Sequence, residues 1–153
     1  MTKRFRIAVV DDHPLVRRGL AETFGEEPDF DIVGDGGSAG DAVRLARDLS
    51  PDLITLDVSM PGGGVEAAAS IIAENPRALL LMVSIREDMD IVKSALTAGA
   101  RGYVSKGITG SDLIAVARKI LSGGRYVSPE LAARLLASDA SFSDLTALDA
   151  PVA

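Results

Sequence analysis

The sequence contains no cysteine and no tryptophan, and it has a single histidine, His13. Without cysteine there can be no disulfides and no thiolate metal sites, and one histidine argues against a zinc site built mainly from imidazoles. No apolar run approaches the length of a membrane span, and the N-terminus lacks the pattern of a signal peptide. We therefore expect a cytoplasmic protein that does not enter a membrane.

Basic residues are also in the minority: 16 Lys and Arg stand against 22 Asp and Glu, which gives a net charge of −6. A chain this acidic is a poor candidate for binding nucleic acid through a broad basic surface. Apolar residues are abundant, at 47% of 153 residues. That content can fill the core of one domain and leaves room for a short appendage.

Apolar runs that fit strands alternate with segments of helical spacing up to about residue 122. This alternation predicts a parallel sheet covered by helices on both faces. Right-handed crossovers then favour an α/β doubly wound, flavodoxin-like (βα)5 fold with strand order 2-1-3-4-5. The five expected strands are Phe5–Val10, Phe30–Val33, Leu53–Leu56, Leu79–Val83 and Gly102–Ser105.

Local signals mark where the helices begin and end. Ser38 with Asp41 and Thr109 with Asp112 resemble capping boxes, and Gly99 should end the helix before it. After residue 124 a further short helix is expected. Its N-cap would be Ser128, followed by Pro129 at the first helical position. The small, polar residues that follow it predict a linker or a frayed end.

Polar side chains follow four of the five expected strands. Asp11 and Asp12 come after the first, Asp57 after the third, Ser84 ends the fourth, and Lys106 follows the fifth. Ligands bind outside the carboxyl ends of the strands in such sheets. Two carboxylates about 4 Å apart repel by about 4 kcal/mol at an effective dielectric constant of about 20, so three of them need a cation. Oxygen ligands favour Mg²⁺, and the whole set suits a phosphoryl group that is being transferred.

Each of these residues also has a plainer interpretation when it is taken alone. An Asp at a strand end is commonly a helix cap, Ser84 would be a turn residue, and Lys106 a solvated surface lysine. His13 could be a general base or a ligand, or simply a partly exposed residue at a helix start, while Arg17 is expected on a solvated helix face. The stretch "GDGGSA", residues 34 to 39, matches a dinucleotide-binding fingerprint. It follows the second strand, however, and a helix entry explains it adequately.

Four stretches resemble the signature blocks of a response-regulator receiver domain of the NarL/FixJ type: "VVDDHPLVRRGL", "DLITLDVSMPGGGVEAA", "LLLMVSIRED" and "AGARGYVSK". Members of that subgroup end in a LuxR-type DNA-binding domain. The resemblance covers residue 5 to about residue 122. It implies a receiver domain over residues 1–122, then a linker with a short helix over residues 123–153, leading to a helix-turn-helix domain outside this chain.

The resemblance also implies a role for each residue of the site. Asp57 would accept the phosphoryl group from a sensor histidine kinase, with Mg²⁺ bound directly by Asp12 and Asp57, through water by Asp11, and by the backbone carbonyl of Ser59. Lys106 would contact the phosphate, Ser84 would be the switch hydroxyl, and Tyr103 the switch aromatic that turns inward behind it. Such a domain is a signalling switch rather than an enzyme, although it catalyses its own phosphorylation and dephosphorylation.

The expected output is control of transcription by a homodimer, with DNA bound only through the helix-turn-helix domain. A phosphohydrolase of the haloacid-dehalogenase type also uses an aspartyl nucleophile and Mg²⁺, but its second acid would fall at Ser59. The residues Met60–Pro61 and the three glycines after them are expected to supply backbone freedom rather than chemistry. The tail "DLTALDAPVA" begins like a LuxR-type domain, which favours a piece of a longer regulator over a stand-alone receiver.

Overall fold

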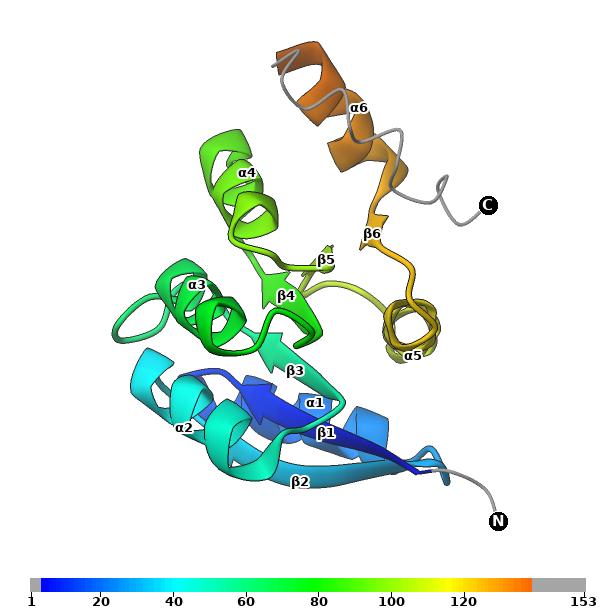
Figure 1. Ribbon diagram of the computed structural model, residues 1–153. Helices are drawn as coiled ribbons and strands as arrows, with labels where there is room; N and C mark the ends of the chain where they lie inside the picture. The colour runs from blue at the N-terminus through cyan, green and yellow to red at the C-terminus, as the bar shows by residue number, and fades with distance from the viewer. Residues whose placement is uncertain (1–3, 139–153) are drawn as a thin grey trace.

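The computed structural model describes residues 4–138 of the chain, and strands and helices alternate along it (Figure 1). The expected order of elements is confirmed, with two further elements at the end. In chain order they are β1 (Phe5–Val10), α1 (Pro14–Gly25), β2 (Phe30–Gly36), α2 (Ala39–Leu49), β3 (Leu53–Leu56), α3 (Gly64–Glu74), β4 (Leu80–Ser84), α4 (Met89–Thr97), β5 (Gly102–Ser105), α5 (Gly110–Leu121), β6 (Tyr126–Val127) and α6 (Pro129–Ser138).

The strands form one parallel sheet in the order β2-β1-β3-β4-β5-β6. The doubly wound fold and the order 2-1-3-4-5 are therefore confirmed. The expectation of only five strands was wrong, because the two residues of β6 pair with Gly102 and Tyr103 of β5. Two residues are too few to show any periodicity in a sequence.

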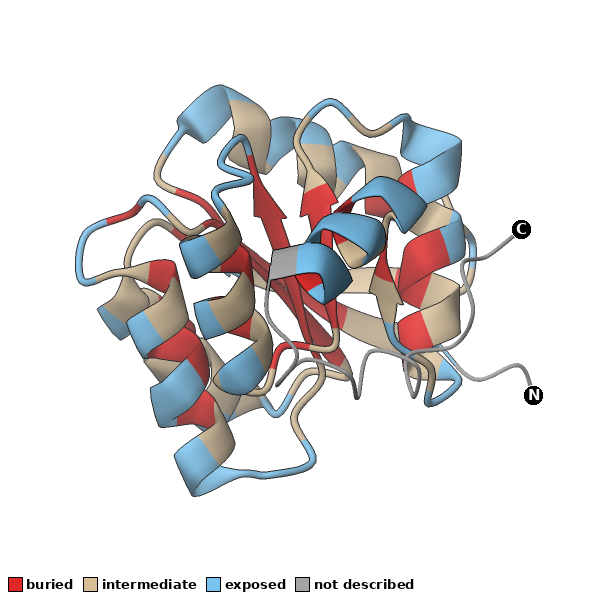
Figure 2. Ribbon diagram, turned by 90° about the horizontal axis from the view of Figure 1, so that it is seen from above, coloured by how far each residue is buried: buried red, intermediate tan, exposed pale blue. Residues whose placement is uncertain are grey.

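Each face of the sheet carries its own apolar core. Along β1, Ala8 and Val10 belong to the apolar cluster that α2, α3, α4 and α6 cover, while Ile7 and Val9 belong to the cluster on the opposite face, under α1 and α5. Figure 1 shows α2, α3 and α4 on one side of the sheet and α1 and α5 on the other. In Figure 2 the central strands are almost entirely buried, whereas the outer sides of the helices are exposed; β2, at the edge of the sheet, is only partly buried. A strand buried on both faces explains the continuous apolar runs in the sequence.

Most of the expected helix ends are found as predicted. The Ser38 hydroxyl accepts a hydrogen bond from the Asp41 N–H at 3.1 Å, and Thr109 does the same for Asp112. Gly99 follows α4 with φ of 113°, a conformation that favours glycine. These caps fix where α2 and α5 begin and therefore how they lie across the sheet.

The segment after α5 packs against the rest of the domain. Ser128 accepts a hydrogen bond from Leu131 N–H at 3.2 Å, as its expected N-cap role requires. Leu131 and Leu135 of α6 are buried, at 2% and 0% exposure, in the same apolar cluster as Val92 of α4. The division of the chain at residue 122 stays a prediction. The expected linker tail and the resemblance of "DLTALDAPVA" to a LuxR-type start lie outside the described residues.

None of the helices within residues 4–138 combines the length and the apolar character that a membrane crossing requires.

Candidate functional site

The register of the sheet brings two carboxylates together at its carboxyl edge. Val10 of β1 pairs with Leu56 of β3, so the next residues, Asp11 and Asp57, leave the sheet side by side. The Asp57 N–H donates a hydrogen bond to the Val10 carbonyl at 3.0 Å, which holds the tip of β3 against β1. Asp11 and Asp57 are almost completely buried, at 0% and 2% exposure. The expected convergence of acids is therefore present.

Lys106 lies between these two carboxylates. Its Nζ is 2.9 Å from Asp11 Oδ2 and 3.3 Å from Asp57 Oδ2, and its side chain is 10% exposed. The Lys106 N–H bonds to the Ser84 carbonyl at 3.0 Å, which ties the end of β5 to the end of β4. The interpretation of Lys106 as a solvated surface lysine was therefore wrong. A single ammonium neutralises only part of the negative charge that the acids bring.

Asp57 differs from an ordinary surface aspartate in its acidity. Burial raises the pKa of its carboxyl, and the negative charge of Asp11 raises it further. The positive charge of Lys106 and the backbone N–H of Ser59 act in the opposite direction. Ser59 itself is exposed, on the loop that follows β3. Carboxyl groups with a perturbed pKa at a sheet edge are typical of functional sites.

The acidic cluster fits a divalent metal ion. Asp11, Asp12, His13 and Asp57 each offer a ligand atom, and these atoms all lie within 4.8 Å of one another. Three carboxylate oxygens, Asp11 Oδ2, Asp12 Oδ1 and Asp57 Oδ2, make no hydrogen bond of ordinary geometry, and the Lys106 ammonium lies beside two of them. The charge on such oxygens is costly to bury unless it is offset. A hard cation with oxygen ligands would satisfy them, so the residues fit Mg²⁺.

Ser84 and Tyr103 lie behind this edge and are both fully buried. The Ser84 hydroxyl accepts a hydrogen bond from the Arg86 N–H at 3.0 Å. The Tyr103 hydroxyl donates a hydrogen bond to the Arg86 carbonyl and also interacts with the Ser84 side chain. The ring is thus turned inward, and its role as a switch aromatic stays a prediction.

The glycine run after Asp57 has two distinct roles. Gly62 and Gly63 both have φ of 86°, so the expected backbone freedom is used there. Gly64 is different, because a Cβ at this position would lie 2.0 Å from the Asp57 carbonyl oxygen. Only a residue without a side chain lets α3 begin this close to the backbone of Asp57. The expectation that these glycines supply freedom alone was wrong for Gly64.

Two residues near the site lie where the sequence alone could not place them. Arg17 was expected on a solvated helix face, but its Nη1 donates a hydrogen bond to the Asp11 carbonyl at 2.9 Å. Arg17 therefore holds the loop after β1 in place. The spacing of residues along a helix does not indicate that one of its side chains bonds to a distant loop. His13 is the N-cap residue of α1 with an exposed side chain, yet its Nδ1 is 3.1 Å from Asp12 Oδ1. The interpretation of His13 as a residue exposed at a helix start is confirmed, and a role as general base or ligand stays a prediction.

The glycine-rich stretch at residues 34 to 39 forms a capped helix entry, as the plainer interpretation stated. The Gly37 N–H donates to Asp41 Oδ2 at 2.9 Å, and Ser38 caps α2. One of the backbone N–H groups that could bind a pyrophosphate at the start of α2 is thus already bonded to Asp41 of the same helix. Negative charge there disfavours a bound phosphate.

Comparison with known proteins identifies the family. Residues 7–118 match the response regulator receiver domain. Response regulator GacA of Pseudomonas aeruginosa is 34% identical over 131 residues, which cover 85% of this chain and 61% of GacA. The chain spans about three fifths of the length of the curated relatives it matches.

Solved structures agree with this match. A two-component response regulator of the LuxR family from an Aurantimonas species has a TM-score of 0.83 and 34% identity, over 88% of this chain and 97% of that one. The receiver domain of the response regulator NarL from Mycobacterium tuberculosis has a TM-score of 0.77 and 28% identity, over 80% and 99% respectively. The chain therefore belongs to the response regulator receiver domains, and within them to the NarL/FixJ type.

Proposed function

We propose that this chain is the phosphorylation-controlled switch of a two-component system and that Asp57 accepts the phosphoryl group. The observation that carries the proposal is the position of Asp57 at a strand tip, 3.3 Å from the Lys106 ammonium and beside the buried Asp11. A rigid strand end fixes the direction of the nucleophile. The neighbouring acids and cation match what phosphoryl transfer needs.

Asp12, Asp57 and the Ser59 backbone carbonyl would hold Mg²⁺ directly, with Asp11 acting through water. Asp11 suits the indirect role because Lys106 already lies 2.9 Å from its Oδ2 and the His13 N–H bonds to its Oδ1 at 2.8 Å. When bound, the ion would neutralise charge on the acids and on the phosphoryl oxygens. Its shell would keep several waters, so we expect weak binding.

In the transfer, a carboxylate oxygen of Asp57 attacks phosphorus, and the bond from phosphorus to the donor's histidine nitrogen or acyl oxygen breaks. The leaving group keeps that electron pair. Lys106 can follow the phosphoryl group, because its ammonium already reaches both Asp57 and Asp11. Its charge would stabilise the oxygens of the product. Hydrolysis of the phosphorylated Asp57 side chain would return the domain to its unphosphorylated state.

The response would pass through Ser84 and Tyr103. A hydrogen bond from Ser84 to the phosphoryl group would draw in the loop after β4, which the Tyr103 hydroxyl already holds at Arg86. A groove of about 300 Å³ flanks the ring, with Val104, Ile108 and Leu131 among its lining residues. That space supports two positions of the ring. Phosphorylation would then shift an existing equilibrium toward the inward position.

The partners follow from the family. We propose that the protein is cytoplasmic, with a sensor histidine kinase as donor and a DNA-binding domain, joined beyond α6, as output. We also propose that phosphorylation favours a homodimer. Sedimentation velocity at equal concentrations, with and without beryllofluoride as a mimic of the phosphoryl group, tests this last point. Unchanged profiles would reject phosphorylation-driven dimerisation while leaving Asp57 as the phosphoacceptor.

The test of the central proposal is intact mass after incubation with Mg²⁺ and a small acyl phosphate. The chain should gain the mass of one phosphoryl group, and Asp57→Asn should gain none. The matched control is Asp48→Asn, which changes an exposed aspartate of α2 and should be phosphorylated like the unaltered chain. An equal mass gain in Asp57→Asn would overturn the assignment of the nucleophile.

A further inference from the structure

His13 adds a nitrogen to a site otherwise made of oxygens. Its Nδ1 is 3.1 Å from Asp12 Oδ1, 3.2 Å from Asp11 Oδ1 and 3.9 Å from Asp57 Oδ2. As the N-cap residue of α1 it makes no side-chain capping bond. The helix start therefore does not require this imidazole, and the ring faces the carboxylates instead.

The distances around His13 are those of ligands that share one ion. Six ligands about 2.1 Å from a metal lie about 3 Å from their neighbours and about 4.2 Å from the ligand opposite. The separations of 3.1 Å to Asp12 and 3.9 Å to Asp57 fall within this range. Asp12 Oδ1 and Asp57 Oδ2 make no hydrogen bond of ordinary geometry, although the Lys106 ammonium lies 3.3 Å from Asp57 Oδ2, and Asp57 is 2% exposed. One ammonium cannot offset three neighbouring carboxylates, so the cluster can take a further cation.

A mixed carboxylate and imidazole ligand set selects its metal. Mg²⁺ prefers oxygen, whereas imidazole suits borderline ions such as Co²⁺, Ni²⁺ and Zn²⁺. We propose that His13 is a further metal ligand, and that it gives this receiver site a preference for a divalent transition ion over Mg²⁺. The inference rests on the proposed function insofar as both place the ion between Asp12 and Asp57.

A counter-ion role for His13 makes the opposite prediction. If the imidazole only offset the charge of the three acids, it would compete with every divalent ion for the same oxygens. Its removal would then tighten the binding of Mg²⁺ and Co²⁺ alike. A ligand role instead predicts weaker Co²⁺ binding and little change for Mg²⁺. The sign of the effect therefore separates the two roles.

The composition of the chain makes the experiment specific. It has one histidine and no cysteine, so with any affinity tag removed His13 is the only imidazole that can bind a metal. Calorimetry should show tighter binding of Co²⁺ than of Mg²⁺. In His13→Ala the Co²⁺ affinity should fall at least about tenfold, since even an outer-shell partner costs that much at metal sites. Glu22→Gln, which changes an exposed acid further along α1, should bind both ions like the unaltered chain.

Proton NMR of the Co²⁺-loaded chain gives a second reading that is independent of phosphorylation. One imidazole N–H resonance should be displaced far outside the normal range, and it should vanish in His13→Ala. Equal Co²⁺ affinity in the variant and the unaltered chain, or tighter binding of both ions in the variant, would overturn the proposal. Failure of the proposed function would look different: Asp57 would gain no phosphoryl mass with Mg²⁺, whatever the Co²⁺ affinities.

Discussion

The Tyr103 hydroxyl donates a hydrogen bond to the Arg86 carbonyl, so β5 is tied to the loop that follows β4. The same loop donates the Arg86 N–H to the Ser84 hydroxyl at 3.0 Å. The two proposed switch residues thus meet at a single peptide segment. If Ser84 moves to bond a phosphoryl group, the Arg86 segment should move with it and displace the Tyr103 hydroxyl. The two residues lie on the neighbouring strands β4 and β5.

Replacing Tyr103 by phenylalanine tests this connection. Tyr103→Phe keeps the buried ring but removes the donor, so the free energy of unfolding should fall by about 1 kcal/mol. Urea denaturation measures the change. Tyr126→Phe, on a ring that is only partly buried, should cost less. An equal cost for both variants would show that the bond to Arg86 contributes nothing beyond an ordinary surface hydroxyl.

The close approach of Gly64 to Asp57 gives a second prediction. In Gly64→Ala the new Cβ would meet the Asp57 carbonyl oxygen at 2.0 Å, so α3 or the tip of β3 must shift. Such overpacking costs about 1–3 kcal/mol. We expect a lower free energy of unfolding in urea and slower phosphorylation of Asp57, because the carboxylate of this proposed nucleophile moves with its backbone.

Gly19→Ala is the matched control for this change. Gly19 lies within α1, and a Cβ there meets nothing within 4 Å. Alanine favours a helix over glycine by up to about 1 kcal/mol, so this variant should be slightly more stable than the unaltered chain. If Gly64→Ala gave the same gain, the inferred clash with Asp57 would be wrong.

The general architecture could be predicted because its causes are local. Strands buried on both faces read as apolar runs, and the caps at Ser38 and Thr109 are short-range patterns. The meeting of Asp11 and Asp57 followed from the rule that parallel strands end at one edge. Each of these inferences needed only neighbouring residues or the direction of a strand.

What could not be predicted depends on distances between segments far apart in the sequence. The clash that keeps Gly64 free of a side chain involves the backbone of β3, and Arg17 reaches the Asp11 carbonyl from a helix whose pattern looks solvated. Strand β6 is too short to show an alternating pattern in the sequence, and it forms by pairing with the otherwise unpaired edge of β5. Sequence spacing carries no record of such contacts.

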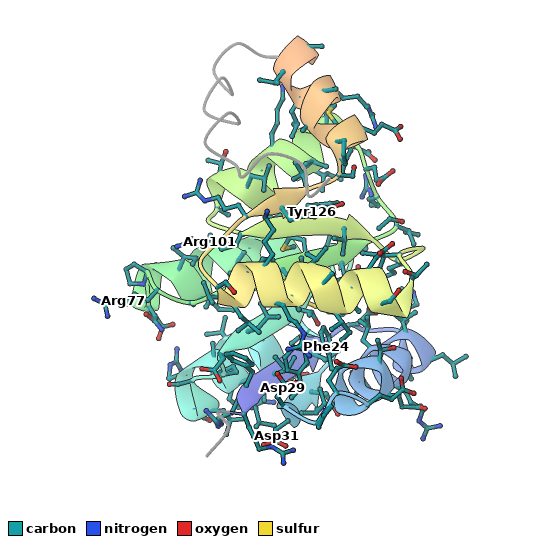
Figure 3. The ribbon with its side chains drawn as sticks, turned by 90° about the vertical axis from the view of Figure 1, so that its right-hand side faces the viewer. Phe24, Asp29, Asp31, Arg77, Arg101 and Tyr126 are labelled. Carbon is teal, nitrogen blue, oxygen red and sulfur yellow. The ribbon has the colours of Figure 1, made fainter. Side chains whose placement is uncertain are left out.

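The ion pair between Arg118 and Asp29 predicts a dependence of stability on pH. Arg118 of α5 bonds to Asp29 at 2.7 Å and lies 4.6 Å from the centroid of the Phe30 ring. Figure 3 shows Phe24 and Asp29 beneath α5, on the face covered by that helix. The hydrogen bond from Arg118 lowers the pKa of Asp29 below its usual 3.8. The pair therefore stabilises the fold above that value, and its contribution is lost as the pH falls through the lowered pKa.

We expect Arg118→Gln to reduce the free energy of unfolding more at neutral pH than at a pH well below 3.8. Urea denaturation at both pH values gives the difference in unfolding free energy between the variant and the unaltered chain. The contributions of most other carboxylates to the pH dependence are the same in both chains and cancel in this difference. The Asp29→Asn background is the control, because Arg118→Gln should there lose the part of its pH dependence that comes from Asp29. A difference that stays constant with pH in the natural background would contradict this account of the pair.

The final prediction concerns α6, whose two neighbouring leucines differ sharply in environment. Leu135 is completely buried in the cluster that also contains Val92 and Tyr103, whereas Leu136 is 46% exposed. Leu135→Ala should therefore lower the free energy of unfolding by about 2–5 kcal/mol, as expected for a cavity in a packed core. Leu136→Ala should change it by no more than about 0.5 kcal/mol. Urea denaturation of the two variants provides the comparison.

The outcome decides whether α6 belongs to the cooperative unit of the receiver domain. If both variants unfold at the same urea concentration as the unaltered chain, α6 must detach before the domain unfolds. Hydrogen exchange would then show faster exchange over residues 129–138 in Leu135→Ala alone. If instead Leu135→Ala lowers the midpoint for the whole domain, α6 is bound to the same core as Tyr103. A change at Asp57 could then reach a following domain through a helix that is already packed on the switch.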